Sequence, residues 1–236
     1  MLQVAHHPLY SPTIPIHAAL ATLAIVAGAV ALLSRKGGTN HSRAGTLYAT
    51  MIGGVVLTGA LLIMTGAWSI RLLVLLGLTS FSTFSGIRVL RRKKPHLDVS
   101  HHARRLDWMA ATVACAIGAG ATLASSLGVE PANARAIYST APLLMVYGAY
   151  DLWRFARPTA WLAGPQLWLG EHITKMCGAY FGAMSALSGA YFTFIPMPNR
   201  IILPNVIGFL LTIILLYRMR RRRAQRSRAA QLHPVH

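Results

Sequence analysis

Apolar residues fill seven long runs of the chain, and polar residues gather in the shorter stretches between them. A helix that crosses the hydrocarbon core of a bilayer needs about 20 apolar residues, and each run approaches that length. The runs are Ile14–Leu33, Ala44–Met64, Trp68–Leu90, Leu106–Leu127, Ile137–Phe155, Trp168–Phe194 and Ile201–Tyr217. The pattern predicts an all-α, polytopic transmembrane bundle of seven helices, with one membrane domain over residues 1–217 and a basic tail over 218–236.

Two runs need a separate argument. Pro142 interrupts the fifth run, but neighbouring helices can satisfy the backbone group that a proline leaves unpaired, so a helix is still expected there. The opening segment, MLQVAHHPLYSPTIPIH, contains no Lys or Arg and so lacks the basic start of a secretory signal peptide. We therefore expect the first run to be a retained helix.

Basic residues are distributed unevenly between the connections. Of the 23 lysines and arginines, nearly all lie after the first, third and fifth runs or in the tail. The exceptions are Arg71, Arg135 and Arg200 in the other connections and Lys175 within the sixth run. By the positive-inside rule, the N-terminus is expected outside and the C-terminus in the cytoplasm. That arrangement requires an odd number of crossings, which seven helices satisfy.

Composition supports a membrane protein over a nucleic-acid binder. The chain is 54% hydrophobic and only 12% charged, whereas soluble domains have about 25% charged residues. The net charge of +18 comes from short basic runs beside apolar segments, which is typical of contact with anionic lipid head groups. The expected partners are therefore the bilayer and its head groups, with no nucleic acid, and self-association stays open. Cys115 and Cys177 have no spacing typical of a disulfide framework or zinc site.

The run that begins at Trp168 carries three titratable residues, Glu171, His172 and Lys175, near its start. A charged group on a membrane-spanning helix is costly unless it is paired or faces a cavity, so it marks a candidate functional site. The expected topology brings other polar residues to the same depth. The polar layer predicted near the cytoplasmic face comprises Tyr48, Asp107, Asp151, Glu171 and Lys175. The alternative is that the acidic residues only pair with arginines of the loops.

His172 and Met176 are four residues apart and share one helical face. Imidazole and thioether groups together are ligands of haem iron and of copper. Two ligands from one helix cannot hold opposite axial positions of a haem, so a second ligand such as His41 would be needed. The alternatives are that His172 pairs with a nearby carboxylate, that Met176 fills the core, and that His41 is a solvated loop residue.

Three short motifs carry a resemblance to a known family. They are HxxxGxxY at residues 41–48, RLDWM at 105–109 and EHITKMCGAY at 171–180. The chain resembles an uncharacterised family of bacterial multi-pass membrane proteins with His-x-x-x-Gly and His-x-x-x-Met motifs. The resemblance implies about seven helices and a bacterial inner (cytoplasmic) membrane, and it points to His41, His172 and Met176 without implying a reaction. The chain departs from the pattern at Leu106 and Asp107, where a more basic pair is expected.

Three functions follow from these features. The first is a redox protein that binds haem b or copper near the cytoplasmic face. The second is a small-molecule or proton-coupled transporter, with Asp151, Glu171, His172 and Lys175 as a titratable gate. The third is a non-catalytic membrane subunit that binds a partner protein. The chain has no Walker loop, GxSxG or HExxH motif, and the lack of an internal repeat weighs against an inverted-repeat transporter.

Overall fold

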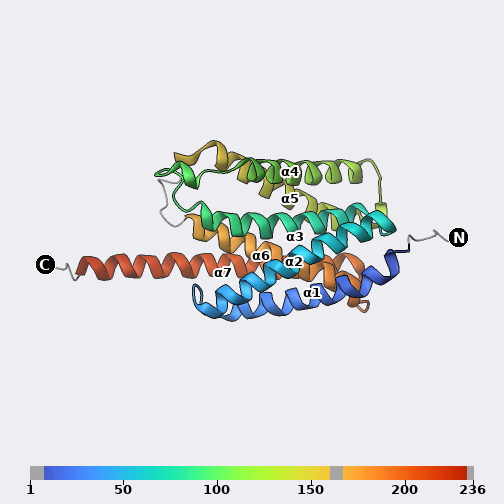
Figure 1. Ribbon diagram of the computed structural model, residues 1–236, viewed down its shortest axis with the longest axis horizontal. Helices are drawn as coiled ribbons and strands as arrows, with labels where there is room; N and C mark the ends of the chain where they lie inside the picture. Colours follow the sequence, from blue (N-terminus) through green and yellow to red (C-terminus); the bar gives the residue numbers. More distant parts are fainter. Residues whose placement is uncertain (1–7, 160–166, 233–236) are drawn as a thin grey trace.

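The structure, a computed structural model, describes residues 8–159 and 167–232, and these residues are mostly helical. Within them there is no strand, and the prediction of an all-α bundle of seven helices is confirmed (Figure 1). The long helices are α1 (Tyr10–Leu33), α2 (Thr39–Thr65), α3 (Ile70–Arg88), α4 (Arg105–Ser126), α5 (Ala134–Ala156), α6 (Leu167–Tyr191) and α7 (Met197–Leu232). Short 3-10 turns lie at Val89–Arg91, Val99–His101 and Pro131–Asn133.

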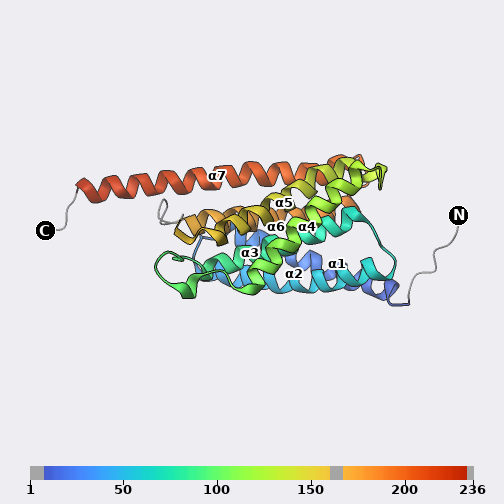
Figure 2. The same ribbon diagram turned by 90° about the horizontal axis from the view of Figure 1, so that it is seen from above.

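Consecutive helices form antiparallel hairpins around a central helix. The closest pairs are α1 with α2, α4 with α5 and α6 with α7, while α3 packs against α2, α4, α5 and α6. In Figure 1, α4 and α5 lie along one side of the bundle and α1 along the other, with α3 and α6 between them. Figure 2 shows α7 along the side opposite α1 and α2. Helices α3 and α6 therefore contact both sides, and their polar residues can join elements that are otherwise apart.

The basic connections meet at one end of the bundle, which we call the basic end. The turn between α1 and α2, the loop between α3 and α4 and the far end of α7 all lie there, and the described N-terminal residues lie at the opposite end (Figure 1). This follows from the antiparallel order of the helices. Basic residues that are separated in sequence thus face the same side of any membrane that the bundle spans.

Large apolar side chains are exposed along the outside of the bundle, including Leu57, Met64 and Phe209. Soluble monomers rarely expose such extensive apolar surface. Among the described residues, the five helices α1, α2, α3, α4 and α7 are long and apolar enough to cross a membrane. The architecture is therefore that of an integral membrane protein. Helices α5 and α6 fall short in composition because charged residues interrupt their apolar runs.

Helix α5 continues through Pro142 without a break, as the sequence predicts. The largest differences from the predicted boundaries are in α2 and α7. Helix α2 begins at Thr39 instead of Ala44 and so includes His41. Helix α7 continues to Leu232, beyond the expected boundary at Tyr217. Arginine and alanine, which are common after Tyr217, favour helix, so a helix already formed in the membrane region can extend into the basic segment. Residues 1–7 and 233–236 of the expected terminal segments lie outside the described part.

Candidate functional site

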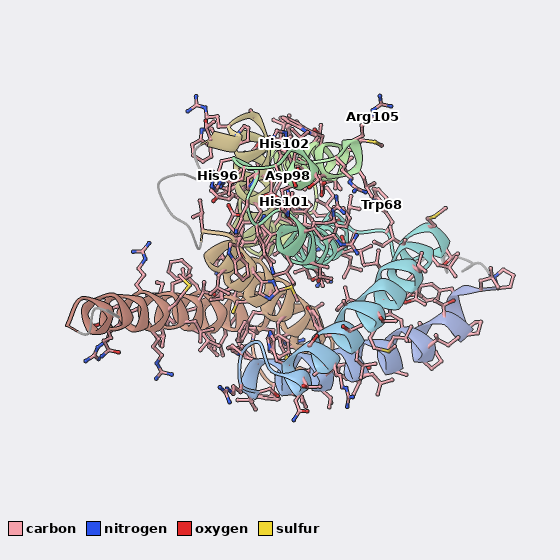
Figure 3. All side chains as sticks on the ribbon, turned by 60° about the vertical axis from the view of Figure 1, so that its left-hand side comes forward. Trp68, His96, Asp98, His101, His102 and Arg105 are labelled. Carbon is pink, nitrogen blue, oxygen red and sulfur yellow. The ribbon has the colours of Figure 1, made fainter. Side chains whose placement is uncertain are left out.

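Four charged residues predicted to form a polar layer are buried at the basic end. Asp107 lies in the first turn of α4, Asp151 near the end of α5, and Glu171 and Lys175 near the start of α6. None of them is more than 6% exposed. The antiparallel order places all of these helix termini at one end, so the topology alone brings the residues to a common depth. The loop that follows α3 lies beside them, with His101 and His102 labelled in Figure 3.

Lys175 joins three helices. Its Nζ donates to Asp151 Oδ1 at 2.5 Å and to Ser85 Oγ at 2.8 Å, and the Ser85 hydroxyl donates to the other oxygen of Asp151. Ser85 belongs to α3, Asp151 to α5 and Lys175 to α6. Both charged side chains are almost fully buried. A buried pair of this kind is stable only while both partners are present, because the remaining charge would otherwise be left without compensation.

Glu171 forms a second cluster between α5 and α6. Its Oε1 accepts hydrogen bonds from Arg154 Nε at 2.9 Å and from the Tyr150 hydroxyl at 2.6 Å. Both charged side chains of this pair are also buried. Arg154 and Tyr150 lie one turn apart on α5, so a single face of that helix holds the carboxylate. This cluster fixes α6 against α5 one helical turn from Lys175.

Asp107 is held by the side chain of Arg88 at the end of α3 and by a backbone N–H at the start of its own helix. Arg88 donates to its two carboxylate oxygens at 2.8 and 2.7 Å, and the Arg104 backbone N–H donates at 2.8 Å. The last contact caps the N-terminus of α4, where a negative charge is favoured. Asp107 therefore pairs with a basic residue, as the alternative interpretation expected, and serves both as a counter-ion and as a helix cap.

The two histidines contact backbone carbonyls instead of acidic residues. His172 Nδ1 lies 2.8 Å from the carbonyl oxygen of Gly86 on α3, so its ring faces the bundle but does not pair with a carboxylate. His41 Nδ1 lies 2.9 Å from the carbonyl oxygen of Ala31. That carbonyl belongs to the last turn of α1, which otherwise lacks intrahelical donors. His41 lies in the first turn of α2, and its contact with α1 stabilises the turn between the two helices.

Met176 packs against α3. Its Sδ lies 2.8 Å from the position that a Cβ on Gly86 would occupy, so the absence of a side chain at residue 86 makes room for the thioether. Among the described residues, no group of three or more His, Cys, Asp and Glu side chains could hold a metal ion. Neither cavity at the basic end is lined by His41, His172 or Met176.

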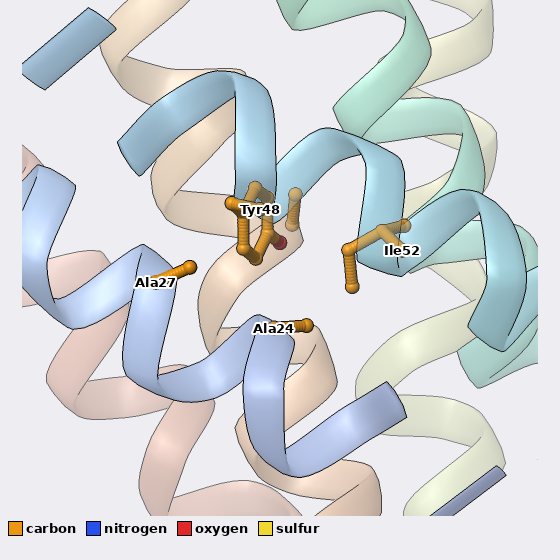
Figure 4. Packing of buried hydrophobic residues seen from close by; sticks show 5 residues of the cluster. Ala24, Ala27, Tyr48 and Ile52 are labelled. Atoms are coloured by element: carbon orange, nitrogen blue, oxygen red, sulfur yellow. The ribbon is translucent and has the colours of Figure 1, made fainter. Parts of the chain in front are cut away.

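Tyr48 lies apart from the charged residues. It is 1% exposed and packs in an apolar cluster with Ala24, Ala27 and Ile52 (Figure 4). Ala179 of α6 completes this cluster. Tyr48 therefore helps to join α1 and α2 to α6, and it is not in contact with the acidic residues that the sequence placed with it.

A small cavity lies between the α3–α4 loop and the ends of α5 and α6. Its lining combines apolar and charged groups: Arg92, Pro95, His102, Ala103, Asp151, Arg154, Phe155, Pro158 and Glu171. The space open to the centre of a water molecule is about 20 Å³. A cavity needs roughly 10–15 Å³ on this measure to hold one water, so this one admits one small species. It lies directly beside both acidic clusters.

Several residues of the site were not identified from sequence. Tyr150 and Arg154 lie near the end of the fifth apolar run, where the sequence gives no sign of their contacts, and Arg92 belongs to the run RRKK, in which every residue is basic. Only Arg92 of that run is buried. Its burial depends on the path of the loop over Phe155, and a charge pattern does not predict that path. Ser85, by contrast, lies in the polar stretch TSFSTFS of an otherwise apolar helix, and the sequence places that stretch in the polar layer.

No protein-family model, no curated protein and no solved structure matches this chain. The resemblance to a bacterial membrane-protein family therefore stays a prediction. The function has to be argued from the geometry of the basic end.

Proposed function

We propose that this protein is a proton-coupled membrane transporter whose titratable site is the Lys175–Asp151–Ser85 contact. The observation that carries the proposal is that this contact joins α3, α5 and α6 while Asp151 also lines a cavity. Structural ion pairs have no need of such a space. In a transporter, a charged pair beside a cavity can respond to both a proton and a substrate.

The proposed coupling follows from the cost of an unpaired buried charge. If Asp151 takes up a proton, Lys175 loses its counter-ion and must find another or release its own proton. Glu171, one turn earlier on α6, is the nearest alternative on the same helix. The other charged groups around Asp151 are Arg154 on α5, Asp107 on α4 and Arg92 in the loop. Protonation would therefore rearrange contacts that hold three helices together.

The test uses purified protein in phosphatidylcholine–phosphatidylglycerol vesicles loaded with a pH-sensitive dye. Inward gradients of chloride, short carboxylates, primary amines and neutral amino acids are imposed in turn, with the membrane potential clamped by valinomycin. We expect at least one solute to change the internal pH with the unaltered protein, and Asp151→Asn to abolish the change. Asp98→Asn is the matched control, since Asp98 is exposed in the α3–α4 loop. A constant internal pH for every solute contradicts the proposal.

A metal-binding role is a second candidate, favoured by one observation. Both His41 and His172 direct Nδ1 at a backbone carbonyl, and metal-ligating histidines commonly use that arrangement to present Nε2 to the metal. Either ring could hold a copper ion. Metal analysis and an absorption spectrum of the purified protein test this candidate, and metal-free, colourless protein would contradict it.

A further inference from the structure

Arg92 is a buried cation that does not share in the ion pairs of the site. It is 5% exposed and its guanidinium carbon lies 4.5 Å from the centre of the Phe155 ring. Its Nε has no hydrogen-bond partner within the described residues. None of the ion pairs found among those residues includes Arg92. The ring covers one face of the guanidinium, and the charge itself is left without a close counter-ion.

The charges around Arg92 do not balance. Arg88 is paired with Asp107, Arg154 with Glu171, and Lys175 with Asp151. Each buried carboxylate thus already has a basic partner. Arg92 is left over, so the cluster carries an excess positive charge at a place where solvation is poor. Buried charges are retained in proteins when something pairs with them.

The cavity described above supplies the place for a counter-ion. Arg92 lines it, together with Arg154 and the half-buried His102. Asp151 and Glu171 also line it, but their oxygens accept hydrogen bonds from Lys175 and Ser85 and from Arg154 and Tyr150. The cavity is therefore bordered by two neutralised carboxylates and one cation that lacks a close partner.

We propose that this cavity binds one small monovalent anion of about the size of chloride, with Arg92 as its counter-ion. The space of about 20 Å³ fits one small anion. The inference rests on the proposed transport function in one respect: it names the substrate class that would move with the proton.

The charge on Arg92 persists despite its burial. Desolvation lowers the pKa of the guanidinium, and the nearby carboxylates of Asp151, Asp107 and Glu171 oppose that change. An arginine titrates so far above neutral pH that it stays protonated under ordinary conditions. The attraction for an anion is therefore present throughout the physiological range.

The experiment measures the melting temperature of the purified protein in detergent while chloride replaces gluconate at constant ionic strength. A ligand that binds only the folded state raises the melting temperature with a saturable dependence on concentration. We expect a rise of a few degrees for the unaltered protein and for Arg91→Gln, which changes the exposed neighbour. We expect the chloride-dependent rise to be absent in Arg92→Gln.

A second variant keeps the test decisive if Arg92→Gln does not fold. Ala103→Leu retains Arg92 but fills the cavity that Ala103 lines, so it should also lose the response to chloride. Equilibrium binding of radioactive chloride to the unaltered protein should show one site for each chain. A melting temperature that does not depend on chloride in the unaltered protein, or an equal response in Arg92→Gln, overturns the proposal.

The two proposals fail in different ways. Chloride binding is measured in detergent and requires no transport, so binding without any change of internal pH in vesicles would reject the transporter and keep the anion site. If the protein changes the internal pH of vesicles but its melting temperature does not depend on chloride, the anion site is rejected and the transporter proposal is kept.

Discussion

At the scale of single residues, the charged side chains of the basic end are arranged as pairs in which each member depends on the other. Lys175 and Asp151 are both almost fully buried and lie 2.5 Å apart. Burying two ions costs several kcal/mol each, on the order of what their attraction returns. The net contribution of such a pair to stability is therefore small, although the loss of either partner is severe.

The first prediction tests this mutual dependence. Asp151→Leu leaves the Lys175 ammonium buried without its counter-ion, and it should lower the free energy of unfolding by about 3–5 kcal/mol. The double variant Asp151→Leu/Lys175→Met should be markedly more stable than Asp151→Leu alone. Unfolding in mixed detergent micelles measures both, with Asp98→Asn expected within about 0.5 kcal/mol of the original protein. Additive losses in the double variant would show that the two residues do not act as a pair.

Glu130 is the acidic residue at the opposite end of the bundle, in the connection between α4 and α5. Its carboxylate accepts hydrogen bonds from the Ile70 backbone N–H at 2.8 Å and the Ser69 hydroxyl at 2.9 Å, so it caps α3. Burial alone would raise the pKa of Glu130. The hydrogen bonds from Ile70, Ser69 and Asn133 outweigh burial and hold the pKa below the usual value of 4.5.

The second prediction follows from that lowered pKa. The stabilisation from Glu130 is fully present above pH 4.5 and is lost as the pH falls through the lower pKa of the folded state. Glu130→Gln should reduce stability at pH 6 by about 1 kcal/mol, the usual value of a helix cap. The difference in melting temperature between the two proteins should shrink between pH 4.5 and pH 3. A difference that stays constant over this range contradicts the assignment.

Much of the charged site could be predicted from sequence at this scale, but its pairings could not. Asp107, Asp151, Glu171 and Lys175 lie near helix ends that the topology brings together, so their common depth follows from counting helices. Which arginine meets which carboxylate depends on side-chain geometry. Arg92 illustrates the limit, because its neighbours in RRKK are exposed while it is buried.

At the scale of elements, α4 and α5 pack backbone against backbone at two glycines. A Cβ at Gly148 would lie 2.7 Å from the Ala111 carbonyl oxygen and 2.8 Å from the Cys115 nitrogen. Gly118 approaches α5 in the same manner. Small residues at such positions let backbones approach closely, which is a main source of helix association in membranes. This contact also sets the distance between Asp107 on α4 and Asp151 on α5.

The third prediction concerns this helix contact. Gly148→Ala must push α4 and α5 apart, since backbone atoms occupy the space of the new methyl group, and should cost about 1–3 kcal/mol. Gly120→Ala is the matched control, because a Cβ there meets nothing within 4 Å. That control should be neutral or stabilising, by up to about 1 kcal/mol. Melting temperatures of the purified proteins compare the two, and equal effects would contradict close packing as the cause.

The helices themselves were predictable because apolar runs of membrane length have few other structures open to them. Their ends were less predictable. Helix α7 continues into the basic segment because arginine is a good helix former, whereas the sequence pattern there showed only that the residues are polar. Helix α2 begins five residues early although four of those residues, Thr39 to Ser42, are poor helix formers, and that shift carries His41 onto the helix.

At the scale of the whole molecule, exposed aromatic residues mark both ends of the bundle. Trp68 precedes α3 and Tyr191 closes α6, away from the basic end, while Trp153 on α5 and Tyr217 on α7 lie towards it. Aromatic residues are enriched at both interfaces of a membrane. Helices α5 and α6 contain 23 and 25 residues, so each is about 35–38 Å long and long enough for a core of about 30 Å. The charged residues Asp151, Arg154, Glu171 and Lys175 are buried against the other helices, which makes crossing compatible with the composition of α5 and α6.

The fourth prediction is that all of these helices cross, with the basic end in the cytoplasm. Single cysteines at Asn40, Val129 and Thr159, each exposed in the structure, are introduced after Cys115 and Cys177 are replaced by alanine. In intact spheroplasts of a bacterial host, a membrane-impermeant maleimide should label Val129→Cys alone. Asn40→Cys and Thr159→Cys should react only after the membrane is permeabilised. Labelling of Thr159→Cys from outside would mean that α5 does not cross, and the reverse pattern at all three sites would invert the orientation.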